Sequence, residues 1–227
     1  MGAALLLRRR ALLGTPAGAP APGPVAPDRG LQFGIPAGAT GGASALLDVP
    51  DGLFTASTFE IDVDVRFDAS STGSYALGLA SGTTDNASLV YGYIANLFEF
   101  YANGTNLGPV RLALGTATPP GNTVYNVKFR HDGTTLAALL NGAPSSSLSA
   151  PGLQLHLDAL VLALGVRNDT GGAPSPVTFA RVAITVGGVL RVNLLLDETT
   201  GTYANTGTIG GQLRLSSPPP ISVLFNP

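Results

Sequence analysis

The sequence has no cysteine and no tryptophan among its 227 residues, and it has only two histidines. Without cysteine the chain can form no disulfide, thiolate nucleophile or cysteine-ligated metal centre. With histidine only at His131 and His156, a histidine-rich metal site or a Ser-His-Asp catalytic site is disfavoured. No apolar run approaches the roughly 20 residues that a membrane-spanning helix needs. These absences favour a soluble, non-redox and non-enzymatic protein without a transmembrane segment or cofactor.

Charged residues are also scarce. They make up 11% of the chain, against about 25% in a typical soluble domain, and Lys128 is the only lysine. The formal net charge is −2, so no basic field attracts nucleic acid. The 30 glycines and 18 prolines supply many turns. The composition therefore predicts a β protein with many turns and no nucleic-acid partner.

The charge is unevenly divided along the chain. Residues 1–30 contain four arginines and one aspartate and carry +3, so the rest of the chain carries −5. In this segment two leucine patches flank an arginine triplet, and a Pro/Gly/Ala-rich stretch follows. We expect a short helix over residues 3–13 and then an extended, polyproline-like run. The residues that define this arm are Leu5, Leu6, Leu7, Arg8, Arg9, Arg10, Leu12 and Leu13.

The arm fits an addressing signal poorly. A secretory signal places its positive charge before 7–15 apolar residues, but only Ala11–Leu13 follow the arginines here. Myristoylation requires Ser or Thr where this chain has Leu6. A segment of this composition cannot bury its own leucines, so a neighbouring subunit is the simplest partner. We interpret residues 1–30 as an assembly arm; a frayed tail and a cleaved export element remain the alternatives.

From residue 31 to residue 227 the dominant pattern is a period of two. Phe59, Ile61, Val63, Val65 and Phe67 alternate with polar residues, which is typical of a strand with one buried face. Residues 125–131, 177–186 and 189–196 extend this pattern to three more strands. Only residues 155–164 could equally form a buried helix.

Turn residues separate these strands. Asp132-Gly133, Asn141-Gly142 and Gly187-Gly188 are typical hairpin turns, and Ala95-Asn96 could join two further strands. Twelve or more short strands in a chain of this length predict an all-β fold, namely a two-sheet antiparallel β-sandwich that follows the arm as one domain.

Several segments resemble concanavalin A-like, laminin G-like jelly-roll domains. The resemblance lies in the order and spacing of segments 31–33, 45–67, 125–142, 179–184 and 196–207, the last of which ends in Asn205-Thr-Gly. It implies a jelly-roll sandwich. The segment Leu-Asp-Glu-Thr-Thr-Gly often opens such domains and here begins at Leu196, so the strand order looks permuted. The tryptophan usual in their early core strand is absent.

The resemblance also suggests an enzymatic alternative. Laminarinase-like glycosidases of this broad fold carry three carboxylates on one strand, and alternation places Glu60, Asp62 and Asp64 on one face here. Retaining hydrolysis needs two carboxyl groups about 5–5.5 Å apart. However, Arg66 and Asp68 continue the polar row as an ordinary solvated face would. We therefore predict no catalytic residues and keep this trio as the alternative.

Two binding sites are weaker candidates. Calcium needs six to eight oxygen ligands, which Asp85, Asp169 and Asp197 with neighbouring asparagines could supply from loops. Asp and Asn equally serve as turn residues. Tyr91, Tyr93 and Tyr101 could form a contact surface for glycan or protein, or simply belong to the core. His131 and His156 are interpreted as structural.

These observations leave two classes of function. We favour a non-enzymatic structural, decoration or fibre component of a virion, such as a bacteriophage, or of a similar extracellular assembly. Its arm would bind other subunits, capsid or tail proteins among them, in an oligomer, while the sandwich is displayed for adhesion to a cell-surface glycan. The alternative is a secreted carbohydrate-binding or laminarinase-like domain.

Overall fold

The structure is a computed structural model. It describes residues 29–33, 43–50, 58–67, 74–81, 84–91, 98–104, 108–114, 124–153, 160–165, 177–197, 202–217 and 219–225. In these ranges every regular element is a β-strand, and every strand pairing is antiparallel.

The strands form two sheets. The eight-stranded sheet has the order β10 (Ala143–Ser149), β9 (Thr135–Leu140), β8 (Val124–His131), β3 (Phe59–Phe67), β12 (Val177–Val186), β1 (Arg29–Phe33) and β15 (Ile221–Leu224), with β13 (Val189–Leu195) also paired to β12. The seven-stranded sheet has the order β14 (Arg214–Leu215), β2 (Ala45–Val49), β11 (Leu160–Leu164), β4 (Ser74–Ser81), β5 (Thr84–Tyr91), β6 (Phe98–Gly104) and β7 (Gly108–Leu114).

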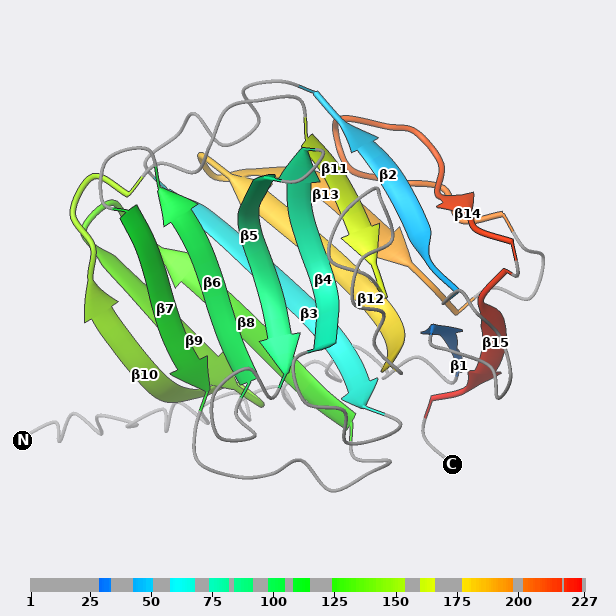
Figure 1. The fold of residues 1–227 in the computed structure, drawn as a ribbon, viewed down its shortest axis with the longest axis horizontal. Helices are drawn as coiled ribbons and strands as arrows, with labels where there is room; N and C mark the ends of the chain where they lie inside the picture. Colours follow the sequence, from blue (N-terminus) through cyan, green and yellow to red (C-terminus); the bar gives the residue numbers. More distant parts are fainter. Residues whose placement is uncertain are drawn as a thin grey trace, which may run out of the picture.

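The two sheets stack face to face as a jelly-roll β-sandwich (Figure 1). The inner faces supply one apolar core, in which β3 contributes Ile61, Val63 and Val65, each at most 3% exposed. Phe100 from the seven-stranded sheet stacks on Phe129 of the other sheet at 4.6 Å between ring centroids. The predicted all-β fold and the inward face of residues 59–65 are confirmed; the side chain of Phe67 lies outside the described residues.

Three of the predicted turns are present. Asp132-Gly133 joins β8 to β9, Asn141-Gly142 joins β9 to β10, and Gly187-Gly188 joins β12 to β13. Asn141 has a φ of 51° and Gly142 of 79°, a left-handed pair that Asn-Gly tolerates. The Oδ1 atom of Asn141 also accepts a hydrogen bond from Asn126 N at 2.9 Å. Local turn chemistry therefore fixes the register of β8, β9 and β10.

One open point of the sequence analysis is resolved. The run 155–164, left open between a strand and a buried helix, contains the strand β11, which lies inside the seven-stranded sheet. The predicted connection at Ala95-Asn96 lies outside the described residues. The first strand begins at Arg29, two residues before the predicted start of the sandwich.

An arginine clamp holds the last strand in place. Arg66, 6% exposed, donates from Nη1 to the carbonyl oxygens of Leu224 (2.7 Å) and Phe225 (3.1 Å). Its Nη2 reaches Thr178 Oγ1 at 3.3 Å. Arg29 adds hydrogen bonds to Ser222 across the β1–β15 pair. Arg66, which the alternation of β3 places on the outer face, thus holds β15 against the sheet.

A loop closes the free edge of β13. The side chain of Asn205 accepts from Asn193 N (2.7 Å) and Gly207 N (2.9 Å) and donates to the carbonyl oxygen of Gly210 (2.9 Å). Gly207 passes so close to β13 that an added Cβ would lie 2.2 Å from Arg191 O. The Asn-Thr-Gly segment singled out in the sequence therefore has an edge-covering role.

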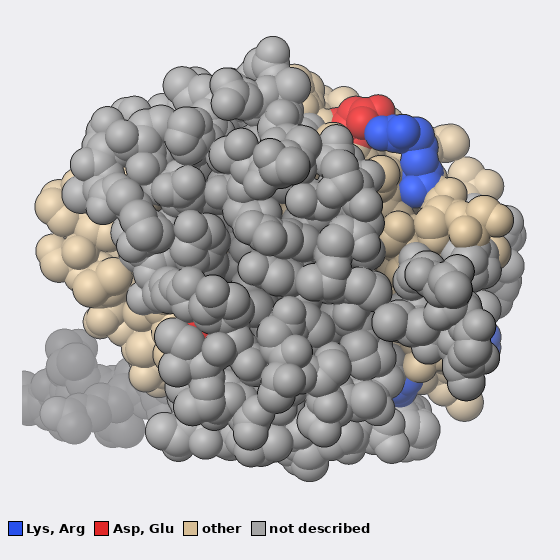
Figure 2. All heavy atoms as spheres, viewed as in Figure 1, with Lys and Arg blue, Asp and Glu red and all other residues tan. Residues whose placement is uncertain are grey.

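Most of the described ion pairs lie on one of the two sheets. Figure 2 shows the side of the seven-stranded sheet, where an acidic and a basic group lie together over β2 and β14; there Asp48 and Arg214 form an ion pair of 2.5 Å. The remaining described ion pairs lie on the eight-stranded sheet. The outer face of that sheet is therefore the place to look for polar chemistry.

Candidate binding face

A polar ladder crosses the outer face of the eight-stranded sheet. Strand β3 supplies Glu60, Asp62 and Asp64, which alternate with its core residues. The neighbouring strands place Arg130, Lys128 and Asn126 of β8 opposite these three, and Thr185, Ala183 and Arg181 of β12 on the other side. The three carboxylates thus share one face of the sheet, as the sequence predicted.

Each of the three carboxylates forms an ion pair with a basic side chain. Lys128 Nζ lies 3.0 Å from Glu60 and 3.3 Å from Asp62. Arg181 reaches Asp62 at 2.9 Å and Asp64 at 2.8 Å. Asn126 Nδ2 donates to both aspartates at 2.8 Å. The acidic residues lie on the solvent side of the sheet, as the sequence predicted, but their pairing leaves them only partly exposed.

The ladder sets the protonation of its members. Burial raises the pKa of Asp62, but hydrogen bonds from Arg181 and Asn126 and the charges of Arg181 and Lys128 outweigh it and bring this pKa below its ordinary value. Burial lowers the pKa of Lys128, but the hydrogen bond to Glu60 and the charges of Asp62 and Glu60 raise it above its ordinary value. The ladder thus keeps these groups charged.

This arrangement does not favour glycoside hydrolysis. A retaining enzyme needs one carboxyl group whose pKa is raised so that it can act as the acid. The central carboxyl, Asp62, is shifted in the opposite direction, and all three carboxylates are engaged by neighbouring side chains. The ladder is better suited to holding β3, β8 and β12 in register.

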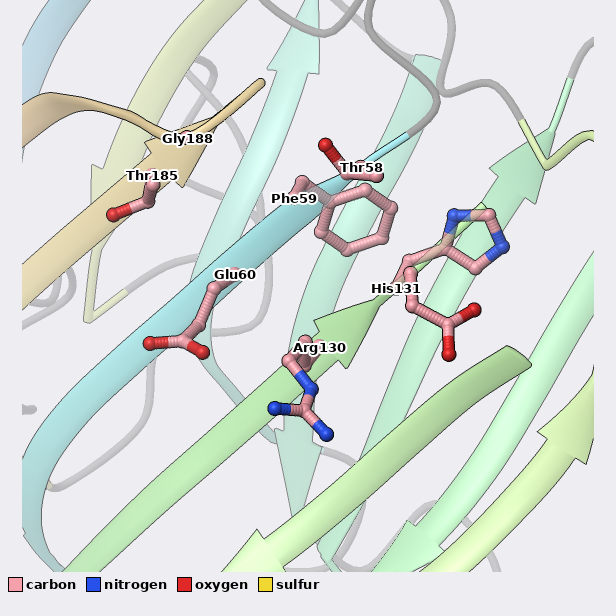
Figure 3. Close-up of a pocket in the computed structure, with 8 residues that line it drawn as sticks. Thr58, Phe59, Glu60, Arg130, His131, Thr185 and Gly188 are labelled. Carbon is pink, nitrogen blue, oxygen red and sulfur yellow. The ribbon is translucent and has the colours of Figure 1, made fainter. Parts of the chain in front are cut away.

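A hollow of about 470 Å³ opens at one end of the ladder. Figure 3 shows Glu60 of β3, Arg130 of β8 and Thr185 of β12 beside it. Its rim is closed by the β12–β13 turn, where Gly187 N donates to Thr58 O at 2.9 Å. The residues that line it are Thr58, Phe59, Glu60, Arg130, His131, Asp132, Thr185 and Gly188.

Hydrogen bonds and ring packing engage two of the residues that line the hollow. His131, 1% exposed, places Nε2 at 2.9 Å from Ala150 O and stacks on Phe59 with 5.5 Å between ring centroids. Asp132 Oδ1 accepts from Thr134 N and Thr135 N at 2.9 and 2.8 Å. The expected structural role of His131 fits this packing, while His156 lies outside the described residues.

Arg130 differs from the other cations of this face. Lys128 and Arg181 each contact two carboxylates, whereas Arg130 is exposed and forms no ion pair with any described residue. Sequence reasoning placed Arg130 outward but did not assign it to a site, and it missed Thr58 and Thr185. The register of β3, β8 and β12 was the missing information, because these strands are distant in sequence.

Of the three calcium candidates, the structure describes only the side chain of Asp197. Asp169 and the side chain of Asp85 lie outside the described residues, and Asp197 is exposed after β13. The side-chain oxygen of Asn205, considered with Asp197, is used by backbone amides. In the described ranges no three Asp, Glu or His side chains form a metal-binding group.

The other candidate residues fall largely outside the described part. Tyr91 and Tyr101 lie on the paired strands β5 and β6, but neither their side chains nor any part of Tyr93 is described. The arm residues, Leu5 to Leu13 with their arginines, also lie outside it. Among the described residues, none belongs to a helix with the length and hydropathy of a membrane span.

Comparison with known proteins shows the fold. No family model and no curated protein matches the sequence. A candidate carbohydrate-binding protein from Bacteroides ovatus matches 88% of this chain with a TM-score of 0.63 and 13% identity; the match spans 61% of that protein. A heptameric SAP-like pentraxin from Limulus polyphemus matches 70% of this chain and 76% of its own, with a TM-score of 0.51 and 11% identity.

Domains LG4-5 of the mouse laminin alpha1 chain match 70% of this chain and 41% of their own, with a TM-score of 0.50 and 12% identity. At such low identities these likenesses describe the fold alone. The chain is similar to concanavalin A-like and laminin G-like jelly-roll sandwiches, as the sequence predicted.

Proposed function

We propose that this protein is a non-enzymatic glycan-binding module whose site is the hollow between β3, β8 and the end of β12. The observation that carries the proposal is the set of polar groups around 470 Å³ of open space. Thr58 and Thr185 offer hydroxyls, Glu60 a carboxylate acceptor and Arg130 up to five N–H donors. Sugar hydroxyls both donate and accept, so they match this mixture of groups.

The carbohydrate-binding description of the structurally similar Bacteroides protein supports this proposal. The hydrogen bonds of His131 and Asp132 support it as well, because lining residues that are already held in place lose little entropy when a ligand binds. The ladder beside the hollow keeps Glu60 oriented through Lys128. The lowered pKa of Asp62 supports binding without cleavage, because an acid catalyst needs a raised carboxyl pKa.

A glycan array with the full chain tests the proposal. We expect wild-type protein to bind a defined set of glycans and Arg130→Ala to lose at least about tenfold in affinity, the effect of roughly 1.4 kcal/mol. Arg214→Ala, which removes an arginine from the other sheet, is the control and should bind like wild type. No binding on the array, or equal binding by Arg130→Ala, would reject this site. Incubation with a bound glycan should release no new reducing ends.

The arm suggests where the module acts. We propose that residues 1–30 attach it to a virion or a similar extracellular assembly through capsid, tail or equivalent subunits. Burial of a leucine contributes about 1.5–3 kcal/mol, so the five leucines favour binding to a partner. Strand β1, which follows the arm, and the hollow lie toward opposite ends of β12, which suits a module that presents its binding site away from its attachment. Strand β1 pairs with the start of β12 at Val177–Phe179. Thr185 of the hollow lies roughly 20 Å further along that strand.

Particle composition tests this location. Mass spectrometry of purified virions or filaments should find the protein at a fixed copy number. A chain that begins at Arg29 should fold, keep its glycan binding and lose incorporation. If the shortened chain is incorporated at full occupancy, the arm is a passive tail. A secreted domain would instead be found free of particles.

A further inference from the structure

A second hollow adjoins the first on the same face. Its volume is about 310 Å³, and its floor is formed by Ala137 and Leu139 of β9 and residues 144–147 of β10. Arg130 lines both hollows. The two spaces therefore meet at Arg130, which is exposed and has no ion pair with a described residue.

The strand register aligns the two hollows in a straight line. Cross-strand pairing places one outward residue per strand in a row perpendicular to the strands. The row consists of Leu190, Thr185, Glu60, Arg130, Ala137 and Ser147. With neighbouring strands about 4.8 Å apart, these six positions span roughly 24 Å.

Side-chain size along the row produces the second hollow. Ala137 and Ser147 are small, whereas Arg130 beside them is long, so the surface falls away from Arg130 toward β10. An irregularity between Pro144 and Ser146 disrupts the β9–β10 register here. Ser146 turns toward the other sheet, where its hydroxyl donates to Ala113 O, while Ser147 stays exposed. The edge strand thus leaves room above Ala137.

We infer that the ligand of this face is an extended oligosaccharide that occupies both hollows and crosses Arg130, and not a single sugar. The inference rests on the proposed function. Arg130 offers parallel N–H donors that fit a pair of oxygen acceptors. Vicinal hydroxyls of a neutral glycan and the carboxylate of an acidic glycan share this chemistry. Thr185 and Glu60 bind the unit in the first hollow, and Ser147 binds the unit above Ala137.

Chain-length series distinguish this inference from the proposed function. The probes are one- to six-unit oligosaccharides of a neutral β-glucan series and of an oligogalacturonate series, added to a general array of single sugars and longer glycans. We expect affinity to rise by about tenfold or more between one unit and three or four units, because the second hollow is then filled. A preference for the uronate series would identify the acceptor at Arg130 as a carboxylate.

A matched pair of variants locates the effect. Ser147→Gln fills the second hollow, whereas Ser149→Gln makes the same change two residues further along β10, outside both hollows. Ser147→Gln should lose the gain from the longer glycans and leave the affinity for the shortest bound glycan unchanged. Ser149→Gln should match wild type. Both positions are exposed, so folding should be unaffected.

Each outcome has one meaning. Equal affinity for single sugars and long glycans, or full affinity of Ser147→Gln for long glycans, overturns the extended ligand and leaves a glycan site at the first hollow. No glycan binding at any length rejects both proposals. Loss of binding in Arg130→Ala together with partial recovery in Arg130→Lys would support direct contact with the ligand, because lysine restores the charge but not the paired donors.

Discussion

At the scale of single residues, Gly207 allows the loop of residues 202–212 to lie against β13. A methyl group there would overlap backbone atoms of Arg191, which cannot rotate away. We expect Gly207→Ala to lower the free energy of unfolding by about 3 kcal/mol, the upper end of overpacking costs. Gly210→Ala is the comparison: its space is open, so only its φ of 65° is unfavourable, at about 1–2 kcal/mol. Urea denaturation measures both, and equal costs would refute the close approach.

Asp132 makes the hairpin beside the first hollow sensitive to acid. Hydrogen bonds from Thr134 N, Thr135 N and the Thr134 hydroxyl lower its pKa from 3.8 to about 2. Because this folded-state pKa is the lower one, the stabilisation is complete above about pH 4 and is lost as the pH falls toward 2. Stability measured across this range should fall more steeply for wild type than for Asp132→Asn. If the stability of the two proteins falls equally steeply as the pH is lowered, Asp132 is not the source of the acid sensitivity.

The alternation of residues predicted the faces but not the partners. The period of two in residues 59–67 was enough to place Glu60, Asp62 and Asp64 together and Val63 inside. It could not place Lys128 or Arg181 against them, because antiparallel register between distant strands depends on the whole sheet. For the same reason Arg130 and Thr185 could not be assigned to one site from the sequence.

At the scale of elements, β15 depends on a residue of another strand. It has only four residues and one neighbour, β1, so its two carbonyl contacts with Arg66 are a large share of its interactions. Arg66→Ala should destabilise the protein by about 3 kcal/mol, since hydrogen bonds to a charged group contribute about 1.5–3 kcal/mol each. Hydrogen exchange at the β1 and β15 amides should accelerate more than exchange elsewhere.

Arg214→Ala is the matched control for the clamp. Its side chain is 60% exposed and pairs with Asp48, which is 73% exposed, so its removal should cost less than about 1 kcal/mol. Equal destabilisation by the two variants would show that Arg66 contributes no more than a surface ion pair does. Unchanged exchange in β15 of Arg66→Ala would lead to the same conclusion.

Elements with strong local signals were the ones predicted from sequence. Asp132-Gly133 and Asn141-Gly142 determine hairpins through their own backbone preferences. The run 155–164 was ambiguous because strands in the middle of a sheet and buried helices can both be apolar throughout.

At the scale of the whole molecule, the sandwich holds the proposed attachment end apart from the proposed binding site. The pair β1–β15 lies at the start of β12, and the two hollows lie beyond its middle, on the outer face. The inner faces form one core, and the ladder and hollows lie outside it. Changes to the outer row can therefore alter ligand preference without disturbing the core.

The pairing of Arg29 with Leu224 has a consequence for chain connectivity. Paired residues in antiparallel strands lie only about 4.5–5.5 Å apart, so a few glycines could join residue 225 to residue 29 and make the sandwich a closed ring. Reopening that ring at the exposed Asn141-Gly142 turn would give a circular permutant with the same ladders. We expect it to unfold cooperatively with near-native circular dichroism. The position of the Leu196 segment late in the chain then reflects only where such a ring is cut, and the fold itself is indifferent to that choice.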